Sequence, residues 1–465
     1  MIADLKPYAA YKDSGLPWLG QVPAHWGQRR MKFLFKERVQ KGFPDEPLLA
    51  ATQSKGVVHK EDYGTRTVTA MKDFHLLKLV ETGDFVISLR SFEGGIEVAH
   101  CRGIISPAYT VLTPTRDVSQ SYYARFFKSA DFIRSLTLFV TGIREGQNID
   151  YERMSRAYMP LPPFDEQLAI GRFLDWANGR LERTIRAKRR VIALLTEQKQ
   201  AIIHRAVTRG VDPAVQLKPS GIPWLGDIPQ HWDVISLRMR YSVELGKMLD
   251  AKRITGRHSL PYLRNRDVQW DKVLIDDLPS MDISPKELSR YTVEVGDLLV
   301  CEGGQVGRCA FWTGPLKKCG FQKALHRIRC LNPCNDYPRF FFYQMQLAAL
   351  RGVFASDGNE NTIAHLPCEK LRRHRFAFPP FSEQKAVADG LDLELQHLEL
   401  TISRLNREIE LLREYRTRLV ADVVTGKLDV REAAARLPED EGEPASEPDA
   451  LAEDEPEDSD ELTEA

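Results

Sequence analysis

The most regular hydrophobic pattern of the chain is a series of leucines seven residues apart in its last quarter. A second apolar series runs between them, and two apolar positions per heptad are typical of a coiled-coil seam. The pattern predicts a long helix over residues 382–426. The seam consists of Leu391, Leu395, Leu398, Ile402, Leu405, Ile409, Leu412, Leu419 and Val423.

A less apolar copy of this seam lies 217 residues earlier in the chain (391 − 174 = 217) and predicts a long helix over residues 165–209. Both helices follow a double proline, which blocks helix upstream, and Asp165 or Ser382 can cap the first amides. Polar residues enter the earlier seam at Asn178, Lys188 and Lys199. Its apolar positions are Leu174, Leu181, Ile185, Ile192, Leu195 and Ile202.

The segments before the two helices also repeat. Residues 14–26 return as residues 220–232 with nine of thirteen positions identical, including Pro-Trp-Leu-Gly and the closing His-Trp. The motif Leu161-Pro-Pro-Phe-Asp-Glu-Gln167 returns as Phe378-Pro-Pro-Phe-Ser-Glu-Gln384. Proline, glycine and tryptophan at fixed offsets indicate a repeated backbone conformation, so the chain is a duplicated unit.

Each globular part reads as mixed α and β structure, and the order of elements is the same in both. In the first we expect strands at 85–89 and 110–112, followed by a helix over 121–139. In the second we expect strands at 298–301, 310–312 and 325–330, followed by a helix over 338–353. The predicted domains are 1–164, helix 165–209, 210–381, helix 382–426 and a tail over 427–465.

The short connection between the first helix and the second domain indicates the direction of pairing. About a dozen residues separate Thr208 from Ser220, and a dozen extended residues reach at most about 42 Å. The first helix must therefore end near the domain from which the second helix starts. We predict an α+β fold in which two mixed domains are separated by an antiparallel coiled coil with pseudo-two-fold symmetry.

Composition narrows the class of protein. The formal net charge is zero, yet residues 438–465 hold 14 acidic residues and no Lys or Arg, which leaves +14 on the rest. A folded region with this positive charge is suited to bind a polyanion such as DNA, and the acidic tail should be disordered. The alternative is a mildly basic protein whose tail only improves solubility. No apolar run approaches the roughly 18 residues of a membrane helix, and no secretory signal opens the chain, so a cytoplasmic location is expected.

The seven cysteines are odd in number and scattered, which does not suggest a disulfide framework. A zinc site formed by the second-half cysteines with His326, His365 or His374 is conceivable. No Cys-x-x-Cys pair supports it, so no metal is expected.

Motifs of catalysis are missing from the sequence. There is no phosphate-binding loop, no glycine-rich adenosyl loop, and no zinc-protease or hydrolase signature. The Pro-Pro-Phe strings are similar to the Pro-Pro-aromatic site of adenine methyltransferases, but Leu161 and Phe378 replace the polar residue that would hold the amino group. A degenerate methyltransferase remains an alternative, and the favoured prediction is a chain that is not an enzyme.

A glycine-rich loop follows the strand after a shared Gly-Asp pair, Gly83-Asp84 or Gly296-Asp297, and would let a ligand approach the backbone. Flanking cations could contact DNA phosphates or read guanine or adenine edges, although for any single one of them a plain solvated charge is the favoured interpretation. The candidate DNA-binding residues are Lys55, Lys60, Arg66, Arg90, Arg102 and Arg144 in the first copy, and Arg264, Arg266, Arg308, Lys317, Lys318, Lys323, Arg327 and Arg329 in the second.

Each long helix reaches a matching stop, Thr208-Arg-Gly210 or Thr425-Gly426. Together, the repeated Pro-Trp-Leu-Gly motif, the Pro-Pro-Phe-x-Glu-Gln helix start, the heptad helices and this ending resemble the specificity subunit of type I restriction-modification systems, over residues 11 to about 430. The resemblance implies two target-recognition domains that each read half of a bipartite DNA site, with helices that set the gap. It also implies modification subunits that bind adenosylmethionine and methylate adenine, and motor-nuclease restriction subunits that use ATP and Mg. The acidic tail is not part of the family pattern.

A coiled-coil adaptor for proteins, without sequence-specific DNA binding, is the main alternative function. An adaptor would need neither a +14 body nor two domains with dissimilar surfaces. Salt-sensitive affinity for DNA would separate the two hypotheses.

Overall fold

The computed structural model describes residues 5–53, 55–63, 73–141, 148–249, 256–354 and 365–438. The chain forms two compact units. Unit 1 contains Met1–Ala187 and Glu408–Ala465, and unit 2 contains Lys188–Arg407. Arg66, Arg144 and all of the acidic tail beyond Pro438 lie outside the described residues.

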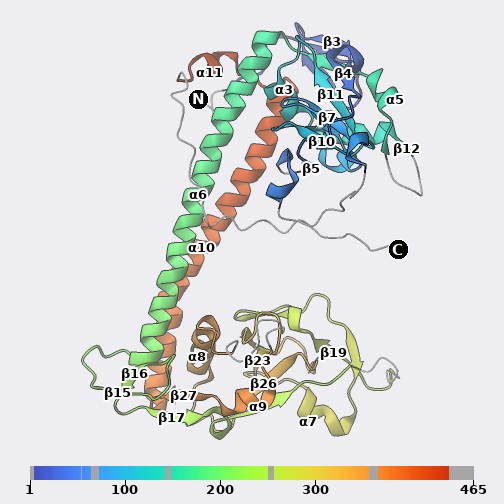
Figure 1. Cartoon of the computed structure of the whole chain (residues 1–465). Helices are drawn as coiled ribbons and strands as arrows, with labels where there is room; N and C mark the ends of the chain where they lie inside the picture. Colours follow the sequence, from blue (N-terminus) through green and yellow to red (C-terminus); the bar gives the residue numbers. More distant parts are fainter. Residues whose placement is uncertain are drawn as a thin grey trace. The chain divides into compact units, whose positions relative to one another are not determined.

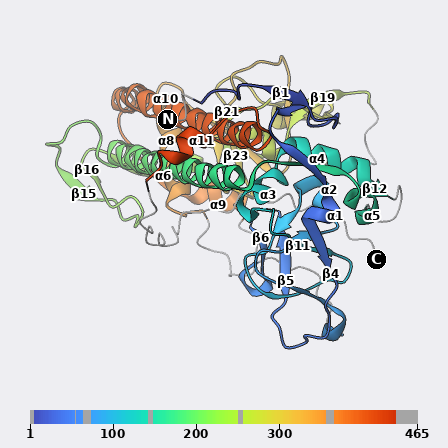
Figure 2. The ribbon, with the colours of Figure 1, turned by 90° about the horizontal axis from the view of Figure 1, so that it is seen from above.

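Unit 1 is built around a four-stranded antiparallel sheet of order β4-β11-β8-β9, accompanied by two-stranded pairs (Figure 1). In the view of Figure 2 the strands β4, β5, β6 and β11 lie together, with α1 and α2 beside them. The strands are β1 Tyr11–Asp13, β2 Gln21–Pro23, β3 Gly27–Arg30, β4 Phe35–Arg38, β5 Leu49–Thr52, β6 Gly56–His59, β7 Lys78–Val80, β8 Phe85–Ile87, β9 Glu97–Val98, β10 Gly103–Ile105, β11 Thr110–Pro114, β12 Val140–Thr141, β13 Asn148–Ile149 and β14 Tyr158–Leu161.

The helices of unit 1 differ from the sequence prediction at one place. A single helix is predicted over 121–139, but the structure has α3 and α4 with a break between them. Ser129 at the break has extended backbone angles, and its hydroxyl donates to the Phe126 carbonyl. The break lets the flanking phenylalanines enter the core. The helices are α1 Met31–Leu34, α2 Ser91–Gly94, α3 Gln120–Phe126, α4 Ala130–Leu136, α5 Tyr151–Ser155 and α11 Arg431–Ala435.

Unit 2 repeats the plan with a four-stranded antiparallel sheet of order β18-β26-β23-β24. Its strands are β15 Leu217–Pro219, β16 Asp227–Pro229, β17 Asp233–Ser236, β18 Tyr241–Leu245, β19 Ser259–Leu263, β20 Val268–Gln269, β21 Lys272–Val273, β22 Ser280–Asp282, β23 Leu298–Cys301, β24 Cys309–Phe311, β25 Gly320–Phe321, β26 Leu325–Cys330 and β27 Arg375–Phe378. Its shorter helices are α7 Leu288–Tyr291, α8 Pro338–Leu350 and α9 Cys368–Arg373.

The two long helices contribute to both units. α6 spans Phe164–Arg209 and α10 spans Phe381–Val424. In unit 1 the start of α6 packs against the end of α10, since Leu174 and Val423 share one core. In unit 2 the end of α6 packs against the start of α10, since Val207 and Leu391 share another. Within each unit the two helices therefore run in opposite directions.

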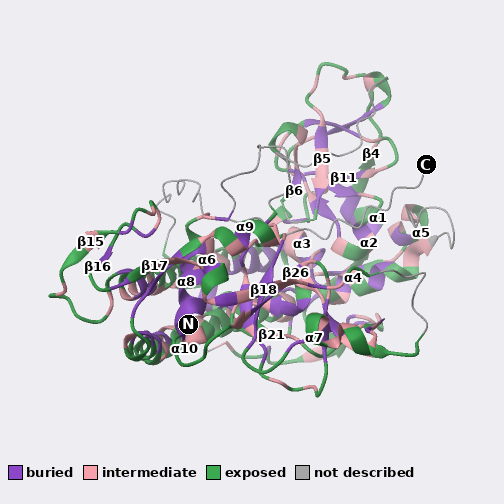
Figure 3. Ribbon diagram, turned by 90° about the horizontal axis from the view of Figure 1, so that it is seen from below, coloured by how far each residue is buried: buried purple, intermediate pink, exposed green. Residues whose placement is uncertain are grey.

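The seam residues lie on the packed side of these helices. Of the fifteen apolar seam residues, eight are buried and seven are half-buried. The buried ones are Leu174, Leu181, Ile185, Leu391, Leu395, Ile409, Leu419 and Val423, and the half-buried ones are Ile192, Leu195, Ile202, Leu398, Ile402, Leu405 and Leu412. The inner strands of both sheets are among the buried segments in Figure 3.

Candidate nucleic-acid interface

The repeated sequence motifs form a hydrogen-bonded junction at the start of each long helix. In unit 1 the Glu166 carboxylate accepts from the indole N–H of Trp26 at 2.8 Å and from the Tyr8 hydroxyl at 2.6 Å, and His25 Nε2 lies 2.7 Å from its other oxygen. Trp26 is fully buried. Burial and the Glu166 carboxylate both raise the pKa of Tyr8, so this hydroxyl stays protonated.

The same junction recurs in unit 2, where the Glu383 carboxylate accepts from Trp232 Nε1 at 3.1 Å and lies 2.7 Å from His231 Nε2. The glutamine that follows each glutamate makes the same hydrogen bonds in both units. Its side-chain oxygen accepts a backbone N–H, and its side-chain NH2 donates to two backbone carbonyls. One of these carbonyls belongs to the proline pair, Pro162 for Gln167 and Pro379 for Gln384. The repeated motif is therefore scaffold.

The other long helix closes each junction with a glycine at its C-terminal end. Gly426, at φ +79°, follows α10, and a Cβ there would lie 2.9 Å from the Trp26 ring. Gly210, at φ +71°, follows α6, and a Cβ there would lie 2.7 Å from Glu383 Oε1. Both glycines take the left-handed conformation that ends a helix and allow a close approach to the tryptophan junction.

The shared Gly-Asp pair gives each sheet a buried aspartate, but its arginine partner differs between the units. Asp84 binds the guanidinium of Arg38, from β4, at 2.7 Å. Asp297 binds Arg329, from β26, at 2.7 Å through each oxygen. Each aspartate also caps the turn before its strand, because Oδ2 accepts the backbone N–H three residues earlier.

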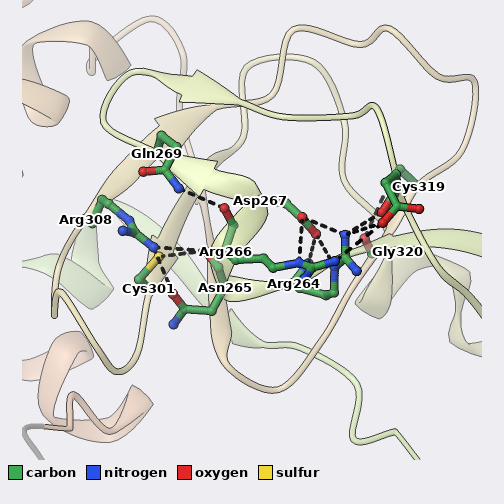
Figure 4. A network of polar contacts seen from close by, with 10 residues as sticks. Arg264, Asn265, Arg266, Asp267, Gln269, Cys301, Arg308, Cys319 and Gly320 are labelled. Atoms are coloured by element: carbon green, nitrogen blue, oxygen red, sulfur yellow. Dashed lines mark hydrogen bonds and ion pairs between the residues drawn. The ribbon is translucent and has the colours of Figure 1, made fainter. Parts of the chain in front are cut away.

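The glycine-rich loop of unit 2 is tied to a short segment inserted between β18 and β23 (Figure 4). Asn265 donates from its amide to the Gly303 carbonyl at 3.0 Å, and Arg308 Nη2 donates to the Asn265 side-chain oxygen at 3.0 Å. Arg266 follows Asn265, and its side chain is 67% exposed. This arrangement leaves the Arg266 guanidinium at the surface, a group that can contact phosphates and base edges.

In unit 1 the corresponding loop, residues 90–95, is tied to the β5–β6 hairpin through Lys128. The Lys128 ammonium donates to the carbonyls of Gln53 at 2.9 Å and Gly94 at 2.8 Å and also binds the buried carboxylate of Glu97. Burial raises the pKa of Glu97 to about 7, although Lys128 acts in the opposite direction. Both units thus anchor the glycine-rich loop to a segment that the repeat does not share.

The candidate DNA-binding cations fall into three groups, according to their bonding partners and their exposure to solvent. Arg264, Arg327 and Arg329 make internal bonds: to Asp267 at 2.9 Å, to the Thr292 carbonyl at 2.6 Å and to Asp297, respectively. Arg102 and Arg308 have partners at the surface, namely Glu46 at 2.9 Å and Asn265. Lys60 is half-buried, whereas the exposed candidates are Lys55, Arg90, Arg266, Lys317, Lys318 and Lys323.

Sequence reasoning missed Asn265, Arg290 and Arg372. Asn265 stands between two candidate arginines and was overlooked because its role depends on contact with Gly303, 38 residues later. No local sequence signal distinguishes Arg290 or Arg372 from other surface arginines. All these site assignments remain predictions.

Among the described residues, no three His, Cys, Asp or Glu side chains are grouped so as to hold a metal ion. The seven cysteines are free thiols, and burial raises the pKa of Cys301, Cys309 and Cys319. Within the same part of the chain, no helix has the length and apolar character needed to cross a membrane.

Curated proteins and solved structures are similar to the chain, although no family model matches it. The specificity subunit of the type I restriction enzyme StySPI from Salmonella potsdam is 23% identical over 349 residues, which cover 68% of this chain and 70% of that protein. The corresponding EcoBI subunit from Escherichia coli is 32% identical over 94 residues, 20% of each chain.

Among solved structures, a chain described in work on complex assembly and conformational transition of the type I R-M system matches with a TM-score of 0.62 at 14% identity. The match covers 88% of this chain and 99% of that one, so the two share a fold. Its mixed helices and strands agree with the predicted α+β class. In sequence the chain is therefore similar to type I restriction enzyme specificity subunits.

Proposed function

We propose that this protein is the DNA-recognition subunit of a type I restriction-modification complex and that units 1 and 2 each read one half of a bipartite site. One observation carries the proposal: the two units share their junctions and sheet order but differ in the segments that surround the glycine-rich loops. Two units with the same scaffold but different loops are suited to recognise two different DNA half-sites.

The long helices would act as an antiparallel coiled coil that sets the gap between the half-sites. Two symmetric ion pairs support this role. Glu182 of α6 binds Arg416 of α10 in unit 1, and Lys199 of α6 binds Glu399 of α10 in unit 2. The glutamates are 217 residues apart (399 − 182), and so are the cations (416 − 199), which equals the shift between the two seams.

The chain would carry no catalytic step of its own. Methylation would be performed by modification subunits that hold adenosylmethionine, and cleavage by restriction subunits that use ATP and Mg. The helices offer these partners exposed leucines at equivalent positions, Leu194 and Leu411, which are 57% and 47% exposed. A partner present in two copies would find the same apolar contact on each unit.

Selection from a library of duplexes with random sequence tests the proposal. The full chain, together with its modification subunits, is incubated with the library, and the bound duplexes are sequenced. Two short conserved blocks at a fixed separation are expected. Exchange of residues 27–160 for those of a relative should alter only one block. Enrichment of no sequence, or of one uninterrupted block, would refute two-headed reading.

The adaptor alternative makes a different prediction for the same material. Binding to DNA through phosphates weakens steeply as salt rises. A protein adaptor would show neither sequence enrichment nor such a salt dependence.

A further inference from the structure

Unit 2 contains a pocket of about 430 Å³ lined by Glu244, Ser289, Arg290, Arg327 and Arg372. The lining comes from four elements: β18, α7, β26 and α9. Three arginines and one glutamate give the lining a formal charge of +2 (3 − 1). This arginine pocket is separate from the loop network of Figure 4, with which it shares no residue.

Arg327 is the most buried member, at 5% exposure. Its Nη1 donates to the backbone carbonyls of Ser289 at 3.1 Å and Thr292 at 2.6 Å, and its Nε is buried without a hydrogen-bond partner. Among the described residues, no carboxylate oxygen lies within 4 Å of this guanidinium. Burial lowers the pKa of Arg327, and the neighbouring Arg329 lowers it further.

The other two arginines stand at the accessible side of the pocket. Arg290 Nε lies 3.3 Å from Glu244, and Arg372 Nη2 lies 3.5 Å from the other oxygen of the same carboxylate. Arg372 is also fixed by a bond from Nε to the Val243 carbonyl at 3.0 Å and by Glu369 at 2.6 Å. Glu244 therefore lies between two guanidiniums at distances longer than those of a close ion pair, and only Arg372 has a second, close carboxylate in Glu369.

The scaffold does not require these charges. The equivalent of Arg327 in unit 1 is Val111, because each pairs with the second residue after the shared aspartate, Leu299 or Val86. Val111 is fully buried in an apolar cluster. A buried cation without a close carboxylate is costly, and unit 1 shows that an apolar residue fits the position.

We propose that the arginine pocket binds a phosphate group of the DNA that unit 2 reads. This inference rests on the proposed function. Arginine presents a fork of donors that matches phosphate oxygens, and a phosphate between Arg290, Arg327 and Arg372 would supply the anion that the buried guanidinium lacks. The Ser289 hydroxyl adds a further donor at the rim. Such a contact contributes affinity and register, and carries no sequence information.

Opposite charge changes at the pocket test the proposal. The full chain and a labelled duplex of random sequence are titrated at several KCl concentrations. Arg290→Ala removes one phosphate contact, so affinity should fall about 3- to 10-fold and the magnitude of the salt slope should decrease by about 0.9. Glu244→Gln removes the competing carboxylate while preserving its shape, so affinity should rise.

Matched controls carry the same charge changes on exposed residues of unit 2 outside the pocket, Arg238→Ala and Asp227→Asn. If the pocket variants behave like these controls, or if both pocket variants weaken binding, the phosphate assignment is wrong. Inorganic phosphate at constant ionic strength provides a second arm. Loss of its binding in Arg290→Ala, with unchanged binding of the duplex, would assign the pocket to free phosphate. Absence of duplex binding by the unaltered chain would instead refute the proposed function.

Discussion

The two sheets place different side chains on one cross-strand row. In unit 1 this row reads Arg38, Val111, Val86 and Glu97 across β4, β11, β8 and β9. In unit 2 the same row reads Glu244, Arg327, Leu299 and Ala310 across β18, β26, β23 and β24. The tryptophan junctions of the two units are nearly identical. The units therefore share a hydrogen-bonded scaffold but carry their charged residues on different strands of the sheet.

This difference separates what the fold needs from what a surface can vary. The strand register and the buried aspartate are common to both units, but the arginine that binds the aspartate comes from the outer strand β4 in one and from β26 in the other. Two arrangements of the same ion pair are therefore compatible with one sheet. Experiments that exchange single residues between the units can show which positions belong to the frame.

The largest effect is expected at the shared junction. Trp26→Ala should lower the free energy of unfolding of unit 1 by about 3–5 kcal/mol, because it removes a fully buried ring. It also leaves the buried Glu166 without its indole donor, which adds about 1–2 kcal/mol. Trp232→Ala should act alike on unit 2. Hydrogen exchange of the strands of each unit measures the two effects separately. A loss confined to one of the two variants would contradict the equivalence of the junctions.

Exchanging Val111 and Arg327, which occupy the same position of the row in the two units, should change the stability of the two units by different amounts. Val111→Arg places a charge without a pocket in an apolar cluster and should destabilise unit 1 by about 3–5 kcal/mol. Arg327→Val should change the stability of unit 2 by no more than about 1 kcal/mol, because release of a buried charge offsets the lost hydrogen bonds. Denaturant unfolding measures both, with Val86→Ile and Leu299→Ile as controls for packing. A loss above about 3 kcal/mol in Arg327→Val would show that this arginine is needed for the fold.

A smaller, pH-dependent difference is expected from the end of the row. Glu97 has a pKa of about 7 in the folded protein and 4.5 as its ordinary value. Between these values the folded state binds more protons than the unfolded state, so the contribution of Glu97 to stability is complete below pH 4.5 and is lost as pH rises to about 7.

Glu97→Ala, which introduces the residue found at position 310, should remove this part of the pH dependence from unit 1. Unfolding midpoints measured between about pH 4.5 and 7.5 test it. Ala310→Gly serves as a control in unit 2. If the unfolding midpoint of Glu97→Ala changed between low and high pH as much as that of the unaltered chain, burial would not raise the pKa of Glu97.

The smallest effect is expected at the two ion pairs between the helices. Arg416→Ala and Lys199→Ala should each lower the free energy of unfolding by less than about 1 kcal/mol, because the glutamates of the two pairs, Glu182 and Glu399, are about half exposed to solvent. High salt should reduce both losses. Equal small losses would support the symmetric pairing, whereas a loss above about 2 kcal/mol at only one pair would indicate that the two contacts differ in kind.

The scaffold could be predicted from the sequence because the repeat marks it. The strand at 325–330 and the start of the helix at Pro338 are found where the sequence places them, since the strand and proline signals are local. The partner of Glu166 is also marked by the repeat, because Trp26 and Glu166 both lie in repeated motifs and return as Trp232 and Glu383.

The site was less predictable because it depends on strand register. Arg327 reads as a surface cation in the sequence, yet its neighbours Leu325 and Ile328 fix it in a buried strand. Lys199 reads as a defect in the seam, and only the antiparallel pairing brings it to Glu399. Side chains that meet through long-range pairing leave no signature in a local window.

The reciprocal use of the helix ends has a consequence for synthesis on the ribosome. The core of unit 1 includes Leu419, Val423 and Val430, whereas unit 2 lies wholly within Lys188–Arg407. The N-terminal globular part therefore emerges first but lacks the residues that cover Trp26 until translation has passed Gly426. Domains usually fold as they leave the ribosome. Here the first unit to be translated is the last that can be completed, and its aromatic junction stays uncovered in the nascent chain until the end of α10 has been made.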